Sequence, residues 1–206
     1  CFVLTYHCED QSEYPIPFKD LAKAVKHVKD NKDLYGIDEN EISLLGFSAG
    51  GHLVGTYGAL IDNKDFQEEM EMTEDDLRVK NLILGYPAIH LKPIVDAICE
   101  TKAFDQVGKL FTNYRKIKDG YAMAHKGMPR TFVFHAVDDP LVPVVISLEY
   151  VQRLSDLGVE VEFYMPSIGG HGFSTGDDLA NYGRDINPRI SIWIDLVDKW
   201  IRDKMD

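Results

Sequence analysis

The stretch ISLLGFSAGGH, from Ile42 to His52, contains the signals that decide the fold of this 206-residue chain. It begins with an apolar run, Ile42 to Leu45, which predicts a strand buried on both of its faces. Ser48 follows among glycines and an alanine, and a helical pattern then runs from Ala49 to Leu60. A serine between a buried strand and a helix indicates a tight turn that exposes the hydroxyl group.

Strand and helix patterns alternate along the rest of the chain. Five strands are expected, at Phe2–Tyr6, Glu41–Phe47, Asn81–Tyr86, Thr131–Ala136 and Val159–Met165. Helical spacing of apolar residues predicts helices at Pro17–Asp33, Ala49–Leu60, Val144–Leu157 and around Ile190–Ile201. This alternation predicts a mostly parallel sheet covered by helices on both faces, a three-layer α/β/α sandwich of five or six strands.

Length and composition favour one globular domain over residues 1–206, because the chain can bury one sizeable core. The segment 62–80 is rich in Asp and Glu and is expected to be an acidic surface insertion. The segment 92–128 has mixed helical patterning. It is expected to cover the sheet edge or to form a cap whose residues line the substrate pocket.

The net charge of −12 excludes some partners and leaves others open. It argues against nucleic acid and against an anionic membrane as partners, and no apolar run reaches the roughly 20 residues of a membrane span. Three irregularly spaced cysteines do not form a disulfide framework, so a reducing, cytoplasmic location is expected. A homodimer through an exposed sheet edge or through the Trp193–Trp200 face is also considered.

Ser48 is the candidate nucleophile, because Gly46 to Gly50 fit the pattern G-x-S-x-G between a strand and a helix. Such a turn strains the serine backbone and leaves no space for side chains at Gly46 and Gly50. The helix that follows directs its N–H groups and its dipole at the turn. The N–H of Ala49 is therefore the expected first donor of an oxyanion hole. The alternative is a glycine-rich turn without chemistry.

A serine nucleophile needs a base and an acid that orients the base. His171 is the candidate base, since it lies in a glycine-flanked loop after the last predicted strand. The loop after the preceding strand contains Asp138 and Asp139. Asp139 is the expected acid, whereas Asp138 is expected to bind loop amides or to hold Asp139. His135 and His52 are expected to be structural, the first packed inside its strand and the second packed or capping locally.

The segments GFSAGGHL, FHAVDDPLVP and GGHGF together resemble the α/β-hydrolase superfamily, and within it the small esterase and lipase-like branch that includes acetyl-xylan esterases. The similarity runs from about Tyr6 to the carboxyl end. It implies Ser48 as nucleophile, Asp139 as acid and His171 as base of an ester hydrolase that needs no metal or organic cofactor. The substrate implied is a short acyl ester, such as an acetyl group on a sugar.

One departure from the family pattern concerns the oxyanion hole. Family members carry an H-G-G-G-like loop before the first strand seen here, and this chain has none. We expect that segment, and the amino-terminal strands with it, to precede Cys1. Two other functions stay open at this point, namely an amide or peptide hydrolase with the same three residues and a non-catalytic protein of hydrolase fold.

Overall fold

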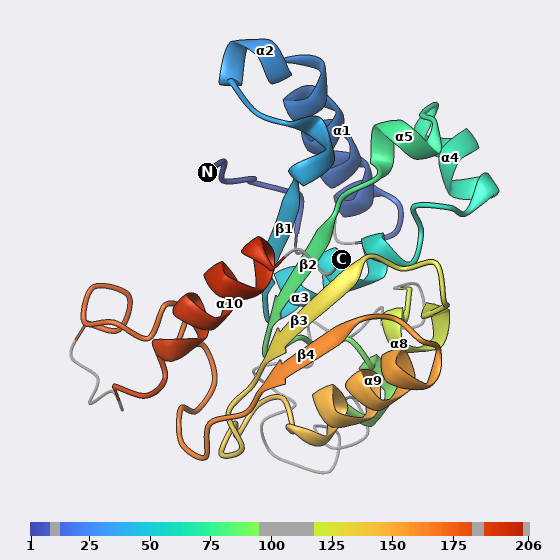
Figure 1. Cartoon of the computed structure of the whole chain (residues 1–206). Coiled ribbons are helices and arrows are strands. Elements are labelled where there is room, and N and C mark those ends of the chain that lie inside the picture. Colours follow the sequence, from blue (N-terminus) through green and yellow to red (C-terminus); the bar gives the residue numbers. More distant parts are fainter. Residues whose placement is uncertain (9–12, 95–117, 183–187, 204–206) are drawn as a thin grey trace.

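A four-stranded parallel sheet forms the centre of the molecule (Figure 1). The structure is a computed structural model, and it describes residues 1–8, 13–94, 118–182 and 188–203. The strands are β1 (Ser43–Phe47), β2 (Asn81–Gly85), β3 (Arg130–Phe134) and β4 (Val161–Tyr164), and they lie in the order β1-β2-β3-β4. All three strand pairs are parallel, so the four carboxyl ends lie along one edge of the sheet.

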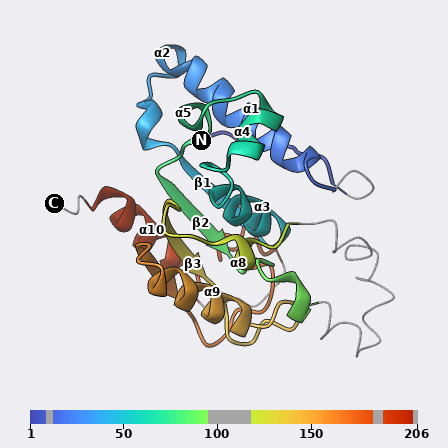
Figure 2. The same cartoon turned by 90° about the vertical axis from the view of Figure 1, so that its right-hand side faces the viewer.

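Helices cover both faces of this sheet, which confirms the predicted three-layer arrangement (Figures 1 and 2). They are α1 (Ile16–Asp30), α2 (Lys32–Tyr35), α3 (Ala49–Gly58), α4 (Lys64–Met70), α5 (Glu74–Leu77), α8 (Gly120–Met123), α9 (Val145–Asp156) and α10 (Ile192–Arg202), with a 3-10 helix at Glu39–Glu41. One core cluster joins α1, α3 and α9 to the sheet, and a second joins α10 to its other face.

The α3 helix lies unusually close to the sheet. Every residue from Gly51 to Gly58 is buried, and glycines at Gly51, Gly55 and Gly58 share the face that meets the sheet. A methyl group on Gly58 would stand 2.3 Å from a side-chain carbon of Leu82. Small residues at this spacing therefore bring the start of α3, and Ser48 with it, against the ends of the strands.

The expected strand at Phe2–Tyr6 is wrong, because residues 1–8 contain no strand. The described sheet has four strands, fewer than the five or six predicted. Alternating apolar residues favour extended backbone, but a strand also needs a hydrogen-bonded neighbour, and among the residues that the structure describes β1 pairs with β2 alone. The side chains of Phe2 and Val3 are accordingly exposed.

The acidic segment 62–80 forms α4 and α5. Its acidic residues Glu68 and Glu71 are exposed, whereas Phe66 and Leu77 are wholly buried in the same core cluster as α1 and α3. A capping box between Thr73 and Asp76 begins α5. Most of the expected cap at 92–128 lies outside the described residues.

Asp76 also joins α5 to α1 through an ion pair with Lys26 of 2.8 Å. Hydrogen bonds from Lys26 and from Thr73 lower the pKa of Asp76 to about 2. The acidic segment is thus attached to the domain by a buried apolar face and by this partly buried pair.

The rings of Trp193 and Trp200, on the face considered for a dimer, point toward the sheet. Trp193 stacks on Phe134 with ring centres 4.1 Å apart, and Trp200 meets the edge of Phe132. Both tryptophans are buried.

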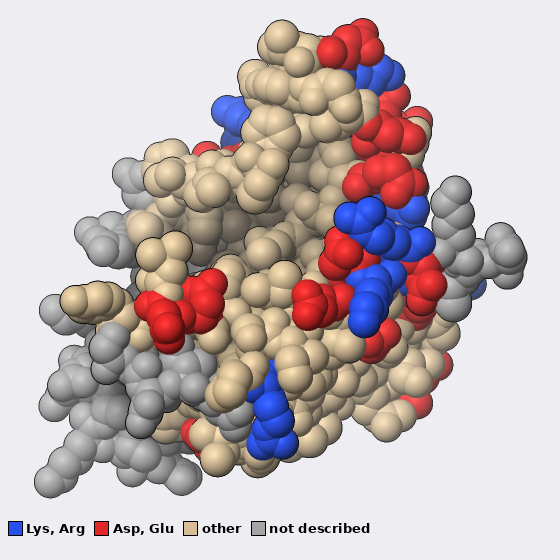
Figure 3. All heavy atoms as spheres, turned by 60° about the vertical axis from the view of Figure 1, so that its left-hand side comes forward, with Lys and Arg blue, Asp and Glu red and all other residues tan. Residues whose placement is uncertain are grey.

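Figure 3 shows one face of the molecule, on which most of the Lys, Arg, Asp and Glu side chains gather on the right-hand flank and uncharged residues surround a hollow at the upper left. Leu45 of β1 is 46% exposed. Within the described ranges, no helix is both long enough and apolar enough to cross a bilayer.

Candidate active site

Ser48 occupies a strained turn between β1 and α3, as the sequence predicts. Its φ of 53° and ψ of −115° lie outside the regions that a serine ordinarily adopts. Three backbone hydrogen bonds hold this conformation: the Ser48 N–H donates to the carbonyl of Gly85, and the Ser48 carbonyl accepts from His52 and Ala88. The turn is therefore anchored to β2 as well as to its own helix.

The space available for a side chain differs among the glycines of the turn. A methyl group on Gly46 would lie 2.2 Å from the carbonyl oxygen of Gly50, so no side chain fits there. At Gly50 the nearest atom is the hydroxyl of Tyr6, at 3.8 Å, and the expectation of a steric need for glycine is wrong. The crowded position is instead Gly51, where a methyl group would be 2.9 Å from Pro87.

The structure brings Ser48, His171 and Asp139 into one chain of hydrogen bonds. The Nε2 of His171 lies 2.9 Å from the Oγ of Ser48, although 123 residues separate them. Its Nδ1 lies 2.7 Å from the Oδ2 of Asp139. A carboxylate only accepts, so Nδ1 carries the hydrogen and Nε2 is free to accept the hydroxyl proton of Ser48.

The Asp139 side chain is wholly buried and receives four donors. Its Oδ1 accepts from the backbone N–H groups of Leu141 and Val142 at 2.8 and 2.9 Å, and its Oδ2 contacts His171 and His135. Burial alone would raise the pKa of this carboxyl, but the hydrogen bonds from His135, His171 and the two amides outweigh it. The pKa of Asp139 is consequently held well below its usual range, and the group is ionised.

Asp138 has a separate role from its neighbour. Its Oδ1 accepts from the backbone N–H groups of Gly169 and Gly170, each at 2.7 Å. One of the two roles considered from sequence, binding of loop amides, is confirmed. Through these bonds Asp138 fixes the loop that presents His171.

Aromatic residues pack against His171 and its loop. The Tyr86 ring meets the His171 ring edge to face with centres 4.9 Å apart, and the Tyr86 hydroxyl accepts from the N–H of Ser174. The indole N–H of Trp193 donates to the carbonyl of Ser174. No local motif marks Tyr86, although its place directly after β2 puts it on the same sheet edge as Ser48.

The start of α3 faces this site with its amide groups. Ala49 is the first helical residue, and the first N–H groups of a helix have no partner within it. Tyr6, which the sequence analysis did not identify as a site residue, places its hydroxyl beside Gly50. Burial raises the pKa of Tyr6, so this hydroxyl is neutral.

The two histidines expected to be structural are both buried. His135 is packed and hydrogen-bonded, as expected, but one of its partners is Asp139. His52 does not cap its own helix, because its Nε2 lies 2.7 Å from the carbonyl of Lys118, 66 residues away. Burial lowers the pKa of His52, so its ring is neutral and donates to that carbonyl.

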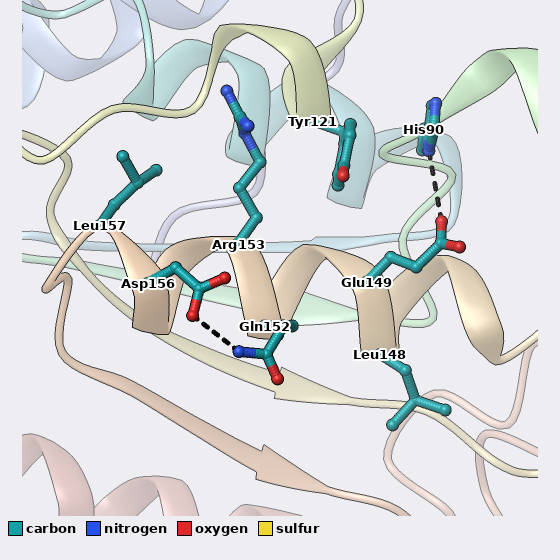
Figure 4. Close-up of a pocket in the computed structure, with 8 residues that line it drawn as sticks. All are labelled: His90, Tyr121, Leu148, Glu149, Gln152, Arg153, Asp156 and Leu157. Carbon is teal, nitrogen blue, oxygen red and sulfur yellow. Dashed lines mark hydrogen bonds and ion pairs between the residues drawn. The ribbon is translucent and has the colours of Figure 1, made fainter.

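A hollow of about 620 Å³ lies along α9, away from these residues (Figure 4). Its lining residues are His90, Tyr121, Leu148, Glu149, Gln152, Arg153, Asp156 and Leu157. Tyr121 stacks on His90, and Gln152 donates to Asp156. Neither Ser48 nor His171 lines this hollow. Over the described part of the chain, no group of three or more His, Cys, Asp and Glu residues is placed to hold a metal ion.

Comparison with known proteins agrees with the fold. Acetylxylan esterase of Xylanibacter ruminicola is 27% identical over 90% of this chain and 38% of that protein. Endo-1,4-beta-xylanase B of Butyrivibrio fibrisolvens is 26% identical over 86% of this chain and 28% of that protein. The chain thus spans about a third of the length of these two relatives.

Among solved structures, a carboxylesterase from Lactobacillus plantarum superposes with a TM-score of 0.80. It is 26% identical, and the match covers 94% of this chain and 69% of that one. The model of the BD-FAE family matches residues 1–154, which include Ser48 and Asp139. By this match the chain belongs to the BD-FAE family, an esterase family of α/β-hydrolase fold.

Proposed function

We propose that the protein is a serine-dependent carboxylic-ester hydrolase that works through an acyl-enzyme. The observation that carries this proposal is the continuous hydrogen-bonded chain from Ser48 through His171 to Asp139. A serine hydroxyl with an oriented imidazole and a buried carboxylate matches the requirements of acyl transfer.

Each side chain then has one task. The Oγ of Ser48 attacks the ester carbonyl while Nε2 of His171 takes its proton, and the Asp139 carboxylate stabilises the resulting imidazolium. The N–H of Ala49 at the start of α3 donates to the oxyanion. His171 next gives its proton to the leaving alcohol. A water molecule, deprotonated by His171, finally attacks the acyl group. The bond between the acyl carbon and Oγ breaks, and His171 returns the proton to Oγ as the acid is released.

We further propose short acyl groups, with acetyl groups on sugars as the natural class. The support is the similarity to a protein named acetylxylan esterase. Cleavage of the sugar chain itself is not proposed, although another relative is named a xylanase. Asp138 and Asp139 are adjacent, and their carboxylates already bind loop amides and histidines. A glycosidase needs two carboxylates that flank the bond, about 5–10 Å apart.

The test is hydrolysis of p-nitrophenyl acetate by the wild-type protein and by the Ser48→Ala variant. The variant should lose about 10⁴-fold or more in kcat, because the nucleophile is gone. Ser155→Ala, at an exposed position in α9, serves as the control and should keep the wild-type rate. Equal rates for wild type and Ser48→Ala would reject Ser48 as the nucleophile.

A second measurement separates ester from amide hydrolysis. p-Nitroacetanilide has the same acyl group as p-nitrophenyl acetate but an amide bond, so the two form a matched pair. The ester should be turned over faster by an active-site route that Ser48→Ala abolishes. Faster turnover of the amide after correction for the uncatalysed rates would favour the amidase alternative. An acetate, butyrate and octanoate series then measures the acyl length.

A further inference from the structure

A second imidazole, outside the chain from Ser48 to Asp139, contacts the same carboxylate. His135 directly follows β3, and its side chain is fully buried. Its Nε2 lies 3.1 Å from the Oδ2 of Asp139 and 3.0 Å from the carbonyl oxygen of Val142. Both of these partners are acceptors, so Nε2 must carry a hydrogen.

The other nitrogen of this ring is also occupied. The Nδ1 of His135 lies 2.8 Å from the Oγ of Ser147 in α9, which is fully buried as well. With the hydrogen on Nε2, Nδ1 accepts the hydroxyl hydrogen of Ser147. The ring is therefore fixed at both ends, in one tautomer and one orientation.

Because Oδ1 of Asp139 binds two backbone amides, the carboxylate cannot rotate without losing them. Its Oδ2 accepts from both His135 and His171. On the basis of the proposed function, we propose that His135 is a positioning residue: its Nε2–H holds Oδ2 of Asp139 where that oxygen accepts the Nδ1–H of His171.

The charges around this oxygen show why a second donor matters. The carboxylate lies in a fully buried place, where an ionised group needs hydrogen-bond donors. The neighbouring carboxylate of Asp138 is engaged with the amides of Gly169 and Gly170 and supplies none. His135 and His171 both donate to Oδ2 and so share its negative charge.

Two amide variants of His135 distinguish positioning from packing. His135→Gln places its amide near the former Nε2 and can still donate to Asp139. His135→Asn places its amide near the former Nδ1, where it reaches Ser147 but not Asp139. Both remove the same ring, and His135→Asn also leaves Asp139 and the Val142 carbonyl without this donor, so it should be the less stable of the two. We expect kcat for p-nitrophenyl acetate to fall about 10- to 100-fold in His135→Asn and to be restored to within about 3-fold by His135→Gln.

The pH profile is the readout that a purely structural role would not change. Without the His135 donor, Oδ2 serves His171 alone and interacts more strongly with its imidazolium. The acid limb of kcat/KM should then move to higher pH in His135→Asn and stay at its wild-type position in His135→Gln. Thr131→Val removes another buried hydrogen bond from β3 and should lower stability without moving the limb. Equal kcat and an unmoved limb in both folded amide variants would overturn the proposal.

A measurement on the wild-type protein covers the case in which His135→Asn does not fold. Nuclear magnetic resonance of ¹⁵N-histidine-labelled protein should show His135 with its hydrogen on Nε2. A hydrogen on Nδ1 would overturn the proposal. This result does not depend on ester hydrolysis. The proposed function would instead be rejected if the wild-type protein were inactive on esters and were not labelled by a fluorophosphonate probe.

Discussion

At the scale of single residues, the candidate site combines one strained backbone with one dense set of hydrogen bonds. Ser48 keeps a φ of 53° because β2 and α3 hold its backbone from both sides. Asp139 stays ionised in a buried place because four donors surround it. The strain and the buried charge each cost stability, and the neighbouring contacts offset that cost.

Gly46 and Gly50 allow a direct test of this description. A methyl group at Gly46 would meet the backbone of Gly50 at 2.2 Å, which neither residue can relieve by a rotamer change. Gly46→Ala should therefore lower the free energy of unfolding by about 1–3 kcal/mol or more. Gly50→Ala has space, and alanine favours a helix, so it should be as stable as wild type or gain up to about 1 kcal/mol. Chemical unfolding measures the free energy of unfolding of both variants. Equal losses of stability would contradict the steric difference between Gly46 and Gly50.

Sequence reasoning identified the residues whose setting is local. Ser48 is marked by the glycines beside it, and Asp139 and His171 by their loops and their order along the chain. The contacts of Tyr86 and His135 are not marked in this way. The contacts of each residue depend on which side chain of another loop lies beside it in space. The residues next to it along the sequence carry no information on that neighbour.

At the scale of elements, the site is made where loops after parallel strands meet at one sheet edge. Ser48 follows β1, Tyr86 follows β2, Asp139 follows β3 and His171 follows β4. The expectation that ligands bind at the carboxyl ends of such strands predicts this convergence. The absence of a strand at Phe2–Tyr6 could not be predicted, because strand formation depends on a neighbouring strand as well as on the local pattern.

The loop after β4 is held by Asp138 more than by its own sequence, which is rich in glycine. Asp138→Ala removes the acceptor of two amide hydrogen bonds. His171 should then be less well placed, and kcat should fall by about 10-fold or more. Asp138→Asn keeps an oxygen acceptor in the same position and should retain most of the rate. Steady-state kinetics on p-nitrophenyl acetate measure both variants, and similar rates for Asp138→Ala and wild type would contradict this role.

At the scale of the whole molecule, folding is linked to the ionisation of buried and bridged carboxylates. Asp139 and Asp76 both have a pKa below the ordinary value, about 2 for Asp76. The folded protein therefore binds these protons less readily than the unfolded chain. Their contribution to stability is complete above about pH 5. It begins to fall near pH 4, the carboxyl value in the unfolded chain, and is lost as the pH falls through the lower values of the folded protein, about 2 for Asp76.

Acid unfolding of the Asp139→Asn variant tests this linkage. The variant should be less stable than wild type at pH 7, and its stability should decline less steeply between about pH 5 and 3. Asp178→Asn, at an exposed position, should follow the wild-type curve. Urea midpoints measured at several pH values give the slopes. A parallel decline in wild type and Asp139→Asn would contradict the linkage.

The order of the strands also sets a sequence of events during protein synthesis. A ribosome incorporates Ser48 123 residues before it reaches His171. Throughout that interval the nascent chain contains Ser48 without its imidazole partner, so the Ser48 hydroxyl is not activated as a nucleophile. Covalent labelling of Ser48 by an acylating reagent should therefore begin only when the loop that carries His171 has docked beside Ser48. The rate of labelling thus reports this late step of folding.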